Sequence, residues 1–450
     1  MKKSKNQKTE VKKYSKNLSV INAHAAGIDI GDSEHYVAIE KGDGYEVRSF
    51  NAFTEGLKAI VAWLILEGIT TVAMESTGIY FLSLYTMLEE AGIDVWLVNA
   101  KHVKNVTGRK QDDTDAIWIQ KLHRCGLLQR SYQPENEQRI LRTYVRQRKN
   151  LITIESDSVR RMQKALELMN IKLHIVISDI LGKTGMQMVE SIINGERDTE
   201  VLIKYKDARI KASNEDIKKS LQGIWSDEYL FMLKQAYDEY HFYQKQIKEC
   251  EVKIEQQLLK YMATIKEGDI TNVVTTKSKR KPIKNQFSFS LTSYLKEIVG
   301  VDLTRIPNIG DATSIEFISE VGYDMTKWGS LNQFSAWLNL APNTKKTGGK
   351  IISSKMMKKK NRAGQTLKMA ASGLAKNKGP LGDYYRRMRG RLGGKGATLA
   401  TAHKLAKIMY TMIKNKKEYD IEKMNKSQEQ YKKHRIKLLE KQLAKLKNAA

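Results

Sequence analysis

The feature that most constrains the fold is the order of apolar segments between residues 21 and 125. Five short runs have the length and composition of strands: "AAGIDI", "HYVAIE", "YEVRSFNA", "TTVAMES" and "IDVWLVNA". Two segments with helical spacing separate the later strands: "TEGLKAIVAWLILEG" and "YFLSLYTMLEEAG". The predicted order is β-β-β-α-β-α-β, which indicates an α/β domain with a mixed sheet.

That order of elements is the order of the RNase H-like fold. We expect the first two strands to form a hairpin around the Gly31-Asp32 turn. The first helix opens with Thr54 as a possible cap and ends at Gly68. The predicted α/β domain covers residues 21–130.

Residues 131–266 are predicted to form a helical, coiled-coil region. Apolar and aromatic residues recur there every seven positions, at Leu233, Tyr240, Ile247, Ile254 and Tyr261, with Ala236, Tyr243 and Cys250 three residues after the first three. This seam fits one long helix packed inside a bundle, and it fits self-association equally well.

The rest of the chain divides by composition. Residues 1–20 read as a disordered basic arm, which has the charge of a signal peptide without its apolar core. A basic polar linker is predicted over 267–295, a compact, mainly α-helical domain over 296–415, and a basic tail, helical or disordered, over 416–450. Within the compact domain, "SLNQFSAWLNLAP" is predicted as a helix that ends at Pro342, and "NTKKTGGKIISSKMMKKKNRAG" as a basic loop.

The charge balance points to a polyanionic partner. Lys and Arg outnumber Asp and Glu by 78 to 50, a formal net charge of +28. Nucleic acid is the usual partner of such an excess, and an anionic membrane is the alternative. No apolar run is long enough to predict a transmembrane helix. Cys125 and Cys250 lie far apart without a metal-binding pattern, which fits a reducing cytoplasm.

Acidic residues stand where a fold alone would not place them. Asp29 and Glu75 each lie at the end of an apolar strand, and Asp112 and Asp115 precede an apolar helix in "RKQDDTDAIWIQKL". Spacing of three puts this second pair on one helical face, although Asp113 competes with Asp112. Carboxylates gathered in one place repel one another, and a hard divalent cation such as Mg²⁺ removes that cost. Two such ions can hold a scissile phosphate.

Simpler roles exist for each acid taken alone. A strand-end aspartate is usually a turn former, which applies to Asp32 beside Gly31. Asp112 or Asp113 could be a helix cap. Glu75 has no capping role inside "VAMES", and the joint pattern is stronger than any single member.

These motifs, in this order, resemble the DEDD transposases of one large family of bacterial insertion sequences, which includes related site-specific DNA invertases. The resemblance rests on "GIDIG", "MESTGIY" and "RKQDDTDA" in residues 21–130, and on "IPNIG", "WLNLAPNTKKTGGK", "NRAG" and "TLATAHKLAKIMYTMIKN" in residues 296–415. It implies a RuvC-like catalytic domain, a coiled-coil segment that supports dimers, and a C-terminal domain whose serine becomes linked to DNA.

The resemblance also implies specific partners and ligands. The family's four acids match Asp29, Glu75, Asp112 and Asp115, with Mg²⁺ as their cofactor. Members act as tetramers, and an RNA from the element's noncoding end pairs with donor and target DNA. We therefore expect DNA and a guide RNA as partners, a homo-oligomer between dimer and tetramer, no membrane, and a bacterial cytoplasmic, nucleoid-associated location.

One position departs from the family. The family's serine precedes a glycine shortly after the "LxP" element, and Thr347 stands there in "KKTGGK". Threonine nucleophiles exist, although the extra methyl group crowds an in-line attack on phosphorus. Ser353 and Ser354 are nearby alternatives. A loop that binds phosphate through Thr and Gly fits Thr347 about as well.

Basic residues near this position predict contacts with nucleic acid. The runs "SSKMMKKKNRAG" and "YYRRMRGRLGGKG" carry lysines and arginines beside glycines and tyrosines. The candidates for backbone binding are Lys350, Lys355, Lys359, Arg362 and Arg387. "IPNIG" resembles a hairpin turn whose amides contact phosphate, with Asn308 in place of a glycine, or else an ordinary helix start.

The resemblance thus implies an RNA-guided transposase or recombinase that cleaves, exchanges and religates DNA through a covalent protein–DNA link. Two other functions fit part of the pattern. A metal-dependent junction nuclease needs the acids but no hydroxyl nucleophile. A catalytically inactive nucleic-acid-binding protein would explain threonine at position 347, but it has no need of clustered acids.

Overall fold

A computed structural model describes residues 19–76, 78–99, 112–266 and 285–447. The side chains of residues 112–114, 265–266, 426–428, 431–432 and 445–447 are outside this description. The chain divides into two compact units, Met1–Gln133 and Pro134–Ala450. Nearly all of the predicted basic arm, and the predicted linker up to residue 284, lie outside the described residues.

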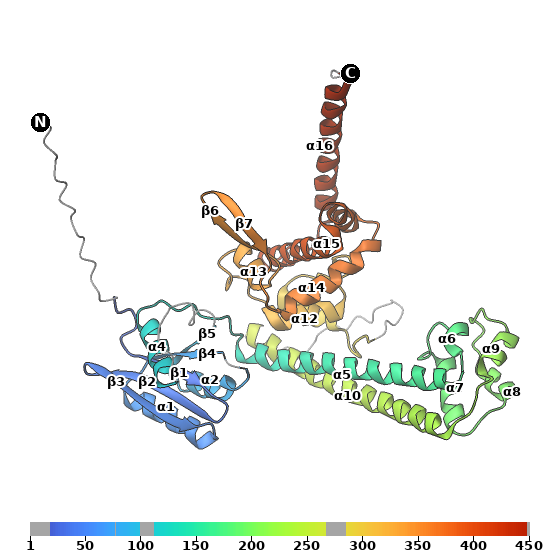
Figure 1. Cartoon of the computed structure of the whole chain (residues 1–450), viewed down its shortest axis with the longest axis horizontal. Helices are drawn as coiled ribbons and strands as arrows, with labels where there is room; N and C mark the ends of the chain where they lie inside the picture. Colours follow the sequence, from blue (N-terminus) through green and yellow to red (C-terminus); the bar gives the residue numbers. More distant parts are fainter. Residues whose placement is uncertain (1–18, 77, 100–111, 267–284, 448–450) are drawn as a thin grey trace, which may run out of the picture. The chain divides into compact units, whose positions relative to one another are not determined.

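The first unit contains the predicted mixed sheet. Its strands are β1 (Ala25–Ile30), β2 (Glu34–Lys41), β3 (Gly44–Asn51), β4 (Thr71–Glu75) and β5 (Asp94–Val98). They lie in the order β3-β2-β1-β4-β5 (Figure 1). The first three are antiparallel, whereas β4 is parallel to both β1 and β5. The order of elements and the hairpin around Gly31 and Asp32 are therefore confirmed.

Helices cover both faces of this sheet (Figure 1). Side chains of α1 (Thr54–Leu66) and α2 (Phe81–Glu90) pack in one core with Ile28, Val72 and Met74 of the strands. Side chains of α4 (Asp112–Arg124) pack with Ala73 and Val98, which point to the opposite face. Successive strand residues thus serve two separate cores. Thr54 begins α1 but is not its cap, because Phe53 is the cap residue and no side chain caps it.

The second unit begins with a helical hairpin. The helices α5 (Asn136–Leu168) and α10 (Asp227–Lys266) lie antiparallel (Figure 1), with polar contacts from Gln257 to Glu137 at one end and from Arg161 to Glu239 toward the other. Between them come α6 (Leu173–Val176), α7 (Lys183–Ile193), α8 (Thr199–Leu202), η1 (Ile203–Tyr205) and α9 (Asn214–Leu221).

The predicted heptad seam of α10 packs within the chain. Six of the eight seam residues are buried: Leu233, Ala236, Ile247, Cys250, Ile254 and Tyr261. Tyr240 and Tyr243 are half-buried. The seam therefore packs largely against other parts of the same chain, and self-association stays a prediction.

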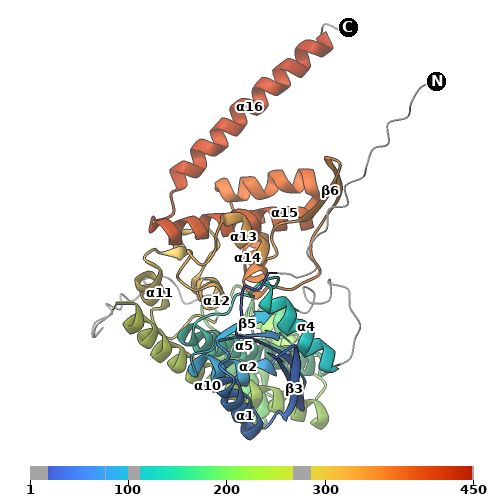
Figure 2. The ribbon, with the colours of Figure 1, turned by 90° about the vertical axis from the view of Figure 1, so that its left-hand side faces the viewer.

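The C-terminal elements follow, and one of them, α12, packs on α5. They are α11 (Leu291–Val299), η2 (Leu303–Arg305), α12 (Asp311–Val321), α13 (Leu331–Trp337), β6 (Asn343–Thr347), β7 (Lys350–Lys355), α14 (Arg362–Gly373), η3 (Leu374–Lys376), α15 (Pro380–Asn415) and α16 (Ile421–Lys447). Arg146 of α5 makes a bidentate ion pair with Glu320 of α12, at 2.7 and 2.8 Å. Helix α14 packs against α15 (Figure 2).

Several sequence expectations for this unit are wrong in detail. The linker predicted over 267–295 stops at Ser290, because α11 starts at Leu291 and buries one side of its first turns. Helix α13 ends at Trp337 rather than at Pro342, since Asn339 takes a left-handed φ of 53° and turns the chain earlier. The basic loop after Pro342 forms the antiparallel strands β6 and β7. The tail, by contrast, is helical over α16, which is one of its two predicted states.

Candidate active site

Strand register brings two of the predicted acids together. Gly27 of β1 pairs with Ala73 of β4, and Ile28 with Met74. The next step along these parallel strands places Asp29 beside Glu75. Because side chains alternate between faces, both acids share the face of Gly27 and Ala73, which is the face that α4 covers.

Helix α4 runs antiparallel to β1 and in close contact with it. Asn22 donates to the carbonyl of His123 at 2.8 Å, and the Gln120 side chain donates to the carbonyl of Ala25 at 3.2 Å. A Cβ atom on Gly27 would lie 2.3 Å from the Ala116 carbonyl oxygen. The chain from residue 22 to residue 27 of β1 therefore runs along α4 from residue 123 back to residue 116. One further step along both elements leads from Gly27 to Asp29 and from Ala116 toward the first turn of α4.

That first turn contains Asp112 and Asp115. Asp29, Glu75 and Asp115 are each half-buried, so each carboxylate has access to solvent at the rim of a core. The Asp112 side chain lies outside the described residues. Among the described side chains, no three His, Cys, Asp or Glu residues lie close enough together to hold a metal ion. The metal site itself therefore stays a prediction, although the oxygen-only donor set suits Mg²⁺.

A buried histidine, which the sequence did not single out, holds α4 on the sheet. The His123 side chain is fully buried, and its Nε2 lies 2.8 Å from the hydroxyl of Thr71 on β4. Its ring lies 5.1 Å from that of Trp96 on β5. Burial lowers the pKa of His123 to about 4, opposed by the nearby charge of Asp94. No sequence pattern marks this residue, because its role depends on contacts with strands far away in the chain.

The candidate nucleophiles all lie on the β6–β7 hairpin. Thr347 is exposed at the end of β6 and pairs with Lys350 across a turn of Gly348 and Gly349, whose φ values of 52° and 76° are left-handed. The Ser354 hydroxyl lies 3.3 Å from that of Thr344, and Ser353 is half-buried. Thr347 is therefore the candidate that lies closest to the tip.

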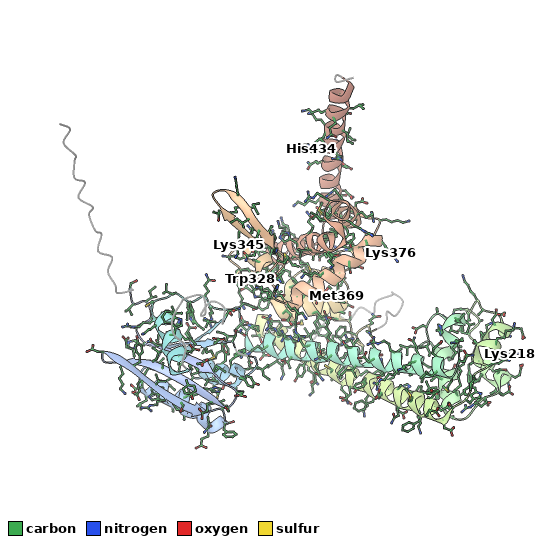
Figure 3. The ribbon with its side chains drawn as sticks, viewed as in Figure 1. Lys218, Trp328, Lys345, Met369, Lys376 and His434 are labelled. Atoms are coloured by element: carbon green, nitrogen blue, oxygen red, sulfur yellow. The ribbon has the colours of Figure 1, made fainter. Side chains whose placement is uncertain are left out.

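The predicted basic contacts surround this hairpin and continue beyond it. Lys350, Lys355 and Lys359 are exposed, as is Arg362, the first residue of α14. Lys345 projects from β6 (Figure 3). The loop after β7 is held in place by the Asn339 side chain, which donates to the carbonyls of Met357 and Lys359 at 3.1 and 2.6 Å.

Arg387 lies on the first half of α15. Its guanidinium carbon lies 5.2 Å from the centre of the Tyr384 ring. Helix α15 consists of two helical lengths that meet at Gly393, where φ is 71°. The hydroxyls of Tyr385 and Thr398 lie 3.3 Å apart, so the two lengths fold back on each other.

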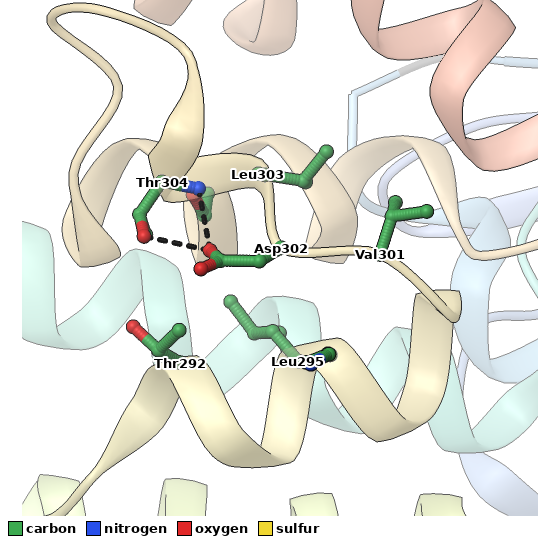
Figure 4. Close-up of a pocket in the computed structure, with 8 residues that line it drawn as sticks. Thr292, Leu295, Val301, Asp302, Leu303 and Thr304 are labelled. Atoms are coloured by element: carbon green, nitrogen blue, oxygen red, sulfur yellow. Dashed lines mark hydrogen bonds between the residues drawn. The ribbon is translucent and has the colours of Figure 1, made fainter. Parts of the chain in front are cut away.

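The "IPNIG" turn is built on an asparagine. Asn308 takes a left-handed φ of 66°, a conformation that asparagine tolerates better than most residues, and its side chain donates to the Ala370 carbonyl. In the preceding turn, the Asp302 carboxylate accepts from the backbone and hydroxyl of Thr304 at 2.9 and 2.6 Å, beside a shallow pocket (Figure 4). Asn308 thus anchors the turn to α14, and a contact with phosphate stays a prediction.

Comparison with protein-family models gives a match in each of two regions of the chain. Residues 26–171 match a family model described as "Transposase", the class with which the mixed sheet and its acidic edge are consistent. Residues 302–386 match the model of the transposase IS116/IS110/IS902 family. The chain therefore carries two regions that match transposase models, and the second of these models is that of the IS116/IS110/IS902 family.

Two negative findings complete the comparison. No curated protein matches the chain. Within the described ranges, no helix is both long and apolar enough to cross a membrane.

Proposed function

We propose that this protein is an insertion-sequence transposase that cleaves, exchanges and religates DNA in a Mg²⁺-dependent reaction, through a covalent protein–DNA intermediate. The observation that carries the proposal is the placement of Asp29 beside Glu75, near the carboxyl ends of the neighbouring parallel strands β1 and β4. The first turn of α4 belongs to the helix that covers the same face of the sheet. The two transposase domains supply DNA as the partner.

The proposed metal site consists of Asp29, Glu75, Asp112 and Asp115. Bound Mg²⁺ would stabilise negative charge on the reacting phosphate. The chain's own contribution is a rigid sheet and a tightly packed helix, which hold the half-buried carboxylates of Asp29, Glu75 and Asp115 in position.

The proposed nucleophile is the Thr347 hydroxyl, with Ser353 and Ser354 as alternatives. Its Oγ forms a bond to phosphorus, the bond from phosphorus to the leaving deoxyribose oxygen breaks, and that oxygen takes up the proton that the threonine loses. One phosphodiester replaces another, so the reverse attack by a new DNA end can religate the strand without an external energy source.

The test is strand cleavage of an element-end duplex, followed on denaturing gels that retain a protein–DNA adduct. Asp29→Asn and Glu75→Gln should each abolish cleavage, while Asp32→Asn, in the exposed turn of the same sheet, should not. Thr347→Ala should abolish the adduct and Thr347→Ser should keep it. Cleavage that survives in a triple variant with alanine at 347, 353 and 354, without an adduct, would instead identify a junction nuclease that uses water.

Threonine at position 347 favours one other function, a decayed transposase that binds nucleic acid without cutting it. The extra methyl group of an exposed threonine hinders in-line attack relative to serine. If the native chain shows no Mg²⁺-dependent recombination and Thr347→Ser restores it, the decayed function is supported and the active one is refuted.

We further propose that an element-encoded RNA guides the reaction, that the protein acts as a dimer to tetramer, and that it works in the bacterial cytoplasm on nucleoid DNA. The net charge of +28 supports the binding of RNA together with DNA. Sequencing of RNA that copurifies with the protein tests the guide. A specific noncoding RNA able to pair with the flanking DNA supports it, and purification free of RNA with full activity contradicts it.

A further inference from the structure

The β6–β7 hairpin exposes two adjacent isoleucines. Ile351 is 62% exposed and Ile352 is 68% exposed. Adjacent residues of a regular strand point to opposite faces, so a hairpin that packed one face on a core would bury one of them. Here neither is buried, and together they form an apolar surface at a basic tip.

A bulge lies at the second of these isoleucines. Lys346 pairs with Ile351, but Lys345 pairs with Ser353. Strand β7 therefore carries one extra residue, Ile352, opposite the Lys345–Lys346 step. A bulge bends a strand and redirects a side chain, and such features are typical of functional rims.

The charge around the two isoleucines limits what can cover them. Lys345, Lys346, Lys350 and Lys355 are all exposed on the same hairpin, and residues 343–355 contain no acidic residue. A second copy of this hairpin would place lysines against lysines, which is unfavourable. A polyanion with an apolar interior satisfies both the charges and the isoleucines, and a nucleic-acid duplex is such a partner.

We propose that the β6–β7 hairpin enters a groove of duplex DNA and that Ile351 and Ile352 act as a wedge between base pairs, with the flanking lysines on the phosphates. This inference rests on the proposed function for its DNA partner. Apolar side chains inserted at a base step unstack it and bend the duplex. B-form DNA has grooves that admit a two-stranded ribbon, whereas the narrow major groove of A-form RNA does not.

The surroundings of the hairpin suit a wedge. The Asn339 contacts with the loop after β7 fix the base of the hairpin to the end of α13. A groove of about 510 Å³ starts there at Met356 and carries Lys368 and Lys395 on its walls. Lys368 and Lys395 can then contact the phosphates of the DNA strand that the wedge displaces.

The experiment measures distortion of DNA in the absence of cleavage. The probe is a duplex of an element end with 2-aminopurine at internal steps and a fluorescent pair at its ends, with Ca²⁺ in place of Mg²⁺. The native chain should raise the 2-aminopurine signal and bring the ends closer. The double variant Ile351→Ala/Ile352→Ala should lose both signals and bind about tenfold more weakly. Its salt dependence should not change, because the lysines remain.

Matched variants separate this role from general effects. Ile175→Ala/Ile224→Ala removes two equally exposed isoleucines elsewhere in the same unit and should change nothing. Ile352→Phe enlarges the wedge and should keep or raise the 2-aminopurine signal, a gain that a folding defect would not give. Lys345→Gln/Lys346→Gln should lower the slope of log affinity against log salt by about 2.

The outcomes that overturn the wedge differ from those that overturn the proposed function. Distortion that persists in the alanine double variant refutes the wedge. If light scattering also shows a changed oligomeric state for that variant, the two isoleucines serve association between subunits instead. Equal or stronger unstacking of an RNA duplex also refutes it. Loss of cleavage in Asp29→Asn with normal distortion supports both proposals. A native chain that cleaves DNA without distorting it refutes the wedge alone.

Discussion

Gly27 is the residue on which the close approach of α4 to the sheet depends. Any side chain there would overlap the backbone of Ala116 and Gln120. We expect Gly27→Ala to displace α4, to lower the free energy of unfolding by about 1–3 kcal/mol, and to reduce metal-dependent cleavage. Gly44→Ala is the control, because nothing lies within 4 Å of its Cβ position and its φ is not left-handed. Thermal unfolding with a cleavage assay checks the pair, and equal effects of both substitutions would contradict this role.

The lowered pKa of buried His123 predicts how the stability of the first unit depends on pH. Burial lowers its pKa in the folded state to about 4, against about 6.5 when unfolded. The folded state thus holds the proton less tightly, so the stability contributed by neutral His123 is complete above pH 6.5 and is lost as the pH falls toward 4. The loss is up to about 3 kcal/mol.

The measurement is chemical unfolding at a series of pH values between 7.5 and 4. The native chain should lose more stability over this range than His123→Gln, which has no proton to bind there. His24→Gln, which replaces an exposed histidine of the same unit, is the matched control. If the profiles of the native chain and His123→Gln run parallel, His123 does not titrate as its burial indicates.

At the scale of single residues, the sequence singles out the acids as candidates but not the residues that position them. Asp29 and Glu75 stand out because a carboxylate at the end of an apolar strand is visible in the sequence. Gly27 and His123 do not stand out, because their roles arise from contacts with α4 and β4 across long stretches of chain. Packing partners of this kind leave no periodic signal.

At the scale of elements, the α5–α10 hairpin depends on one buried ion pair. The Glu251 carboxylate accepts from Arg148 at 2.6 and 2.8 Å and from the backbone of Ser288 at 2.9 Å. Arg148 also lies over the Phe287 ring, 3.6 Å from its centre. The pair therefore ties both long helices to the start of the C-terminal elements.

We expect Glu251→Gln to lower the free energy of unfolding by about 3–5 kcal/mol, because it leaves the Arg148 charge buried without its counterion. Glu249→Gln, an exposed glutamate on the same helix, should have little effect. The double variant Arg148→Met/Glu251→Leu should regain most of the loss. Denaturant unfolding measures all three, and a small effect of Glu251→Gln would show that the pair contributes little.

Periodicity explains which elements could be foreseen. The heptad seam of α10 and the alternation of strands and helices in residues 21–125 each repeat over several turns or strands, so the pattern is strong. The β6–β7 hairpin has no buried face. Without a core to select apolar residues at every second position, its sequence resembles a basic loop, and that is how it was predicted.

At the scale of the whole molecule, the proposed catalytic groups belong to two different compact units. The acids belong to the unit that ends at Gln133, and Thr347 belongs to the unit that begins at Pro134. If the proposed acids and the Thr347 hydroxyl act in one site, an oligomer can supply them from the same chain or from different subunits.

Complementation between inactive variants tests this arrangement. Glu75→Gln lacks an acid and Thr347→Ala lacks the hydroxyl, so each should be inactive alone as a homo-oligomer. If each site takes its acids from one subunit and its hydroxyl from another, mixed oligomers formed by coexpression contain intact sites, and we expect about a quarter to a half of native cleavage to return. A mixture of Glu75→Gln with Asp29→Asn is the control, because both defects lie among the acids and no mixed site is complete. Activity that stays absent in the first mixture, with mixed oligomers confirmed by tag-based pull-down, would place the acids and Thr347 of each site in the same chain.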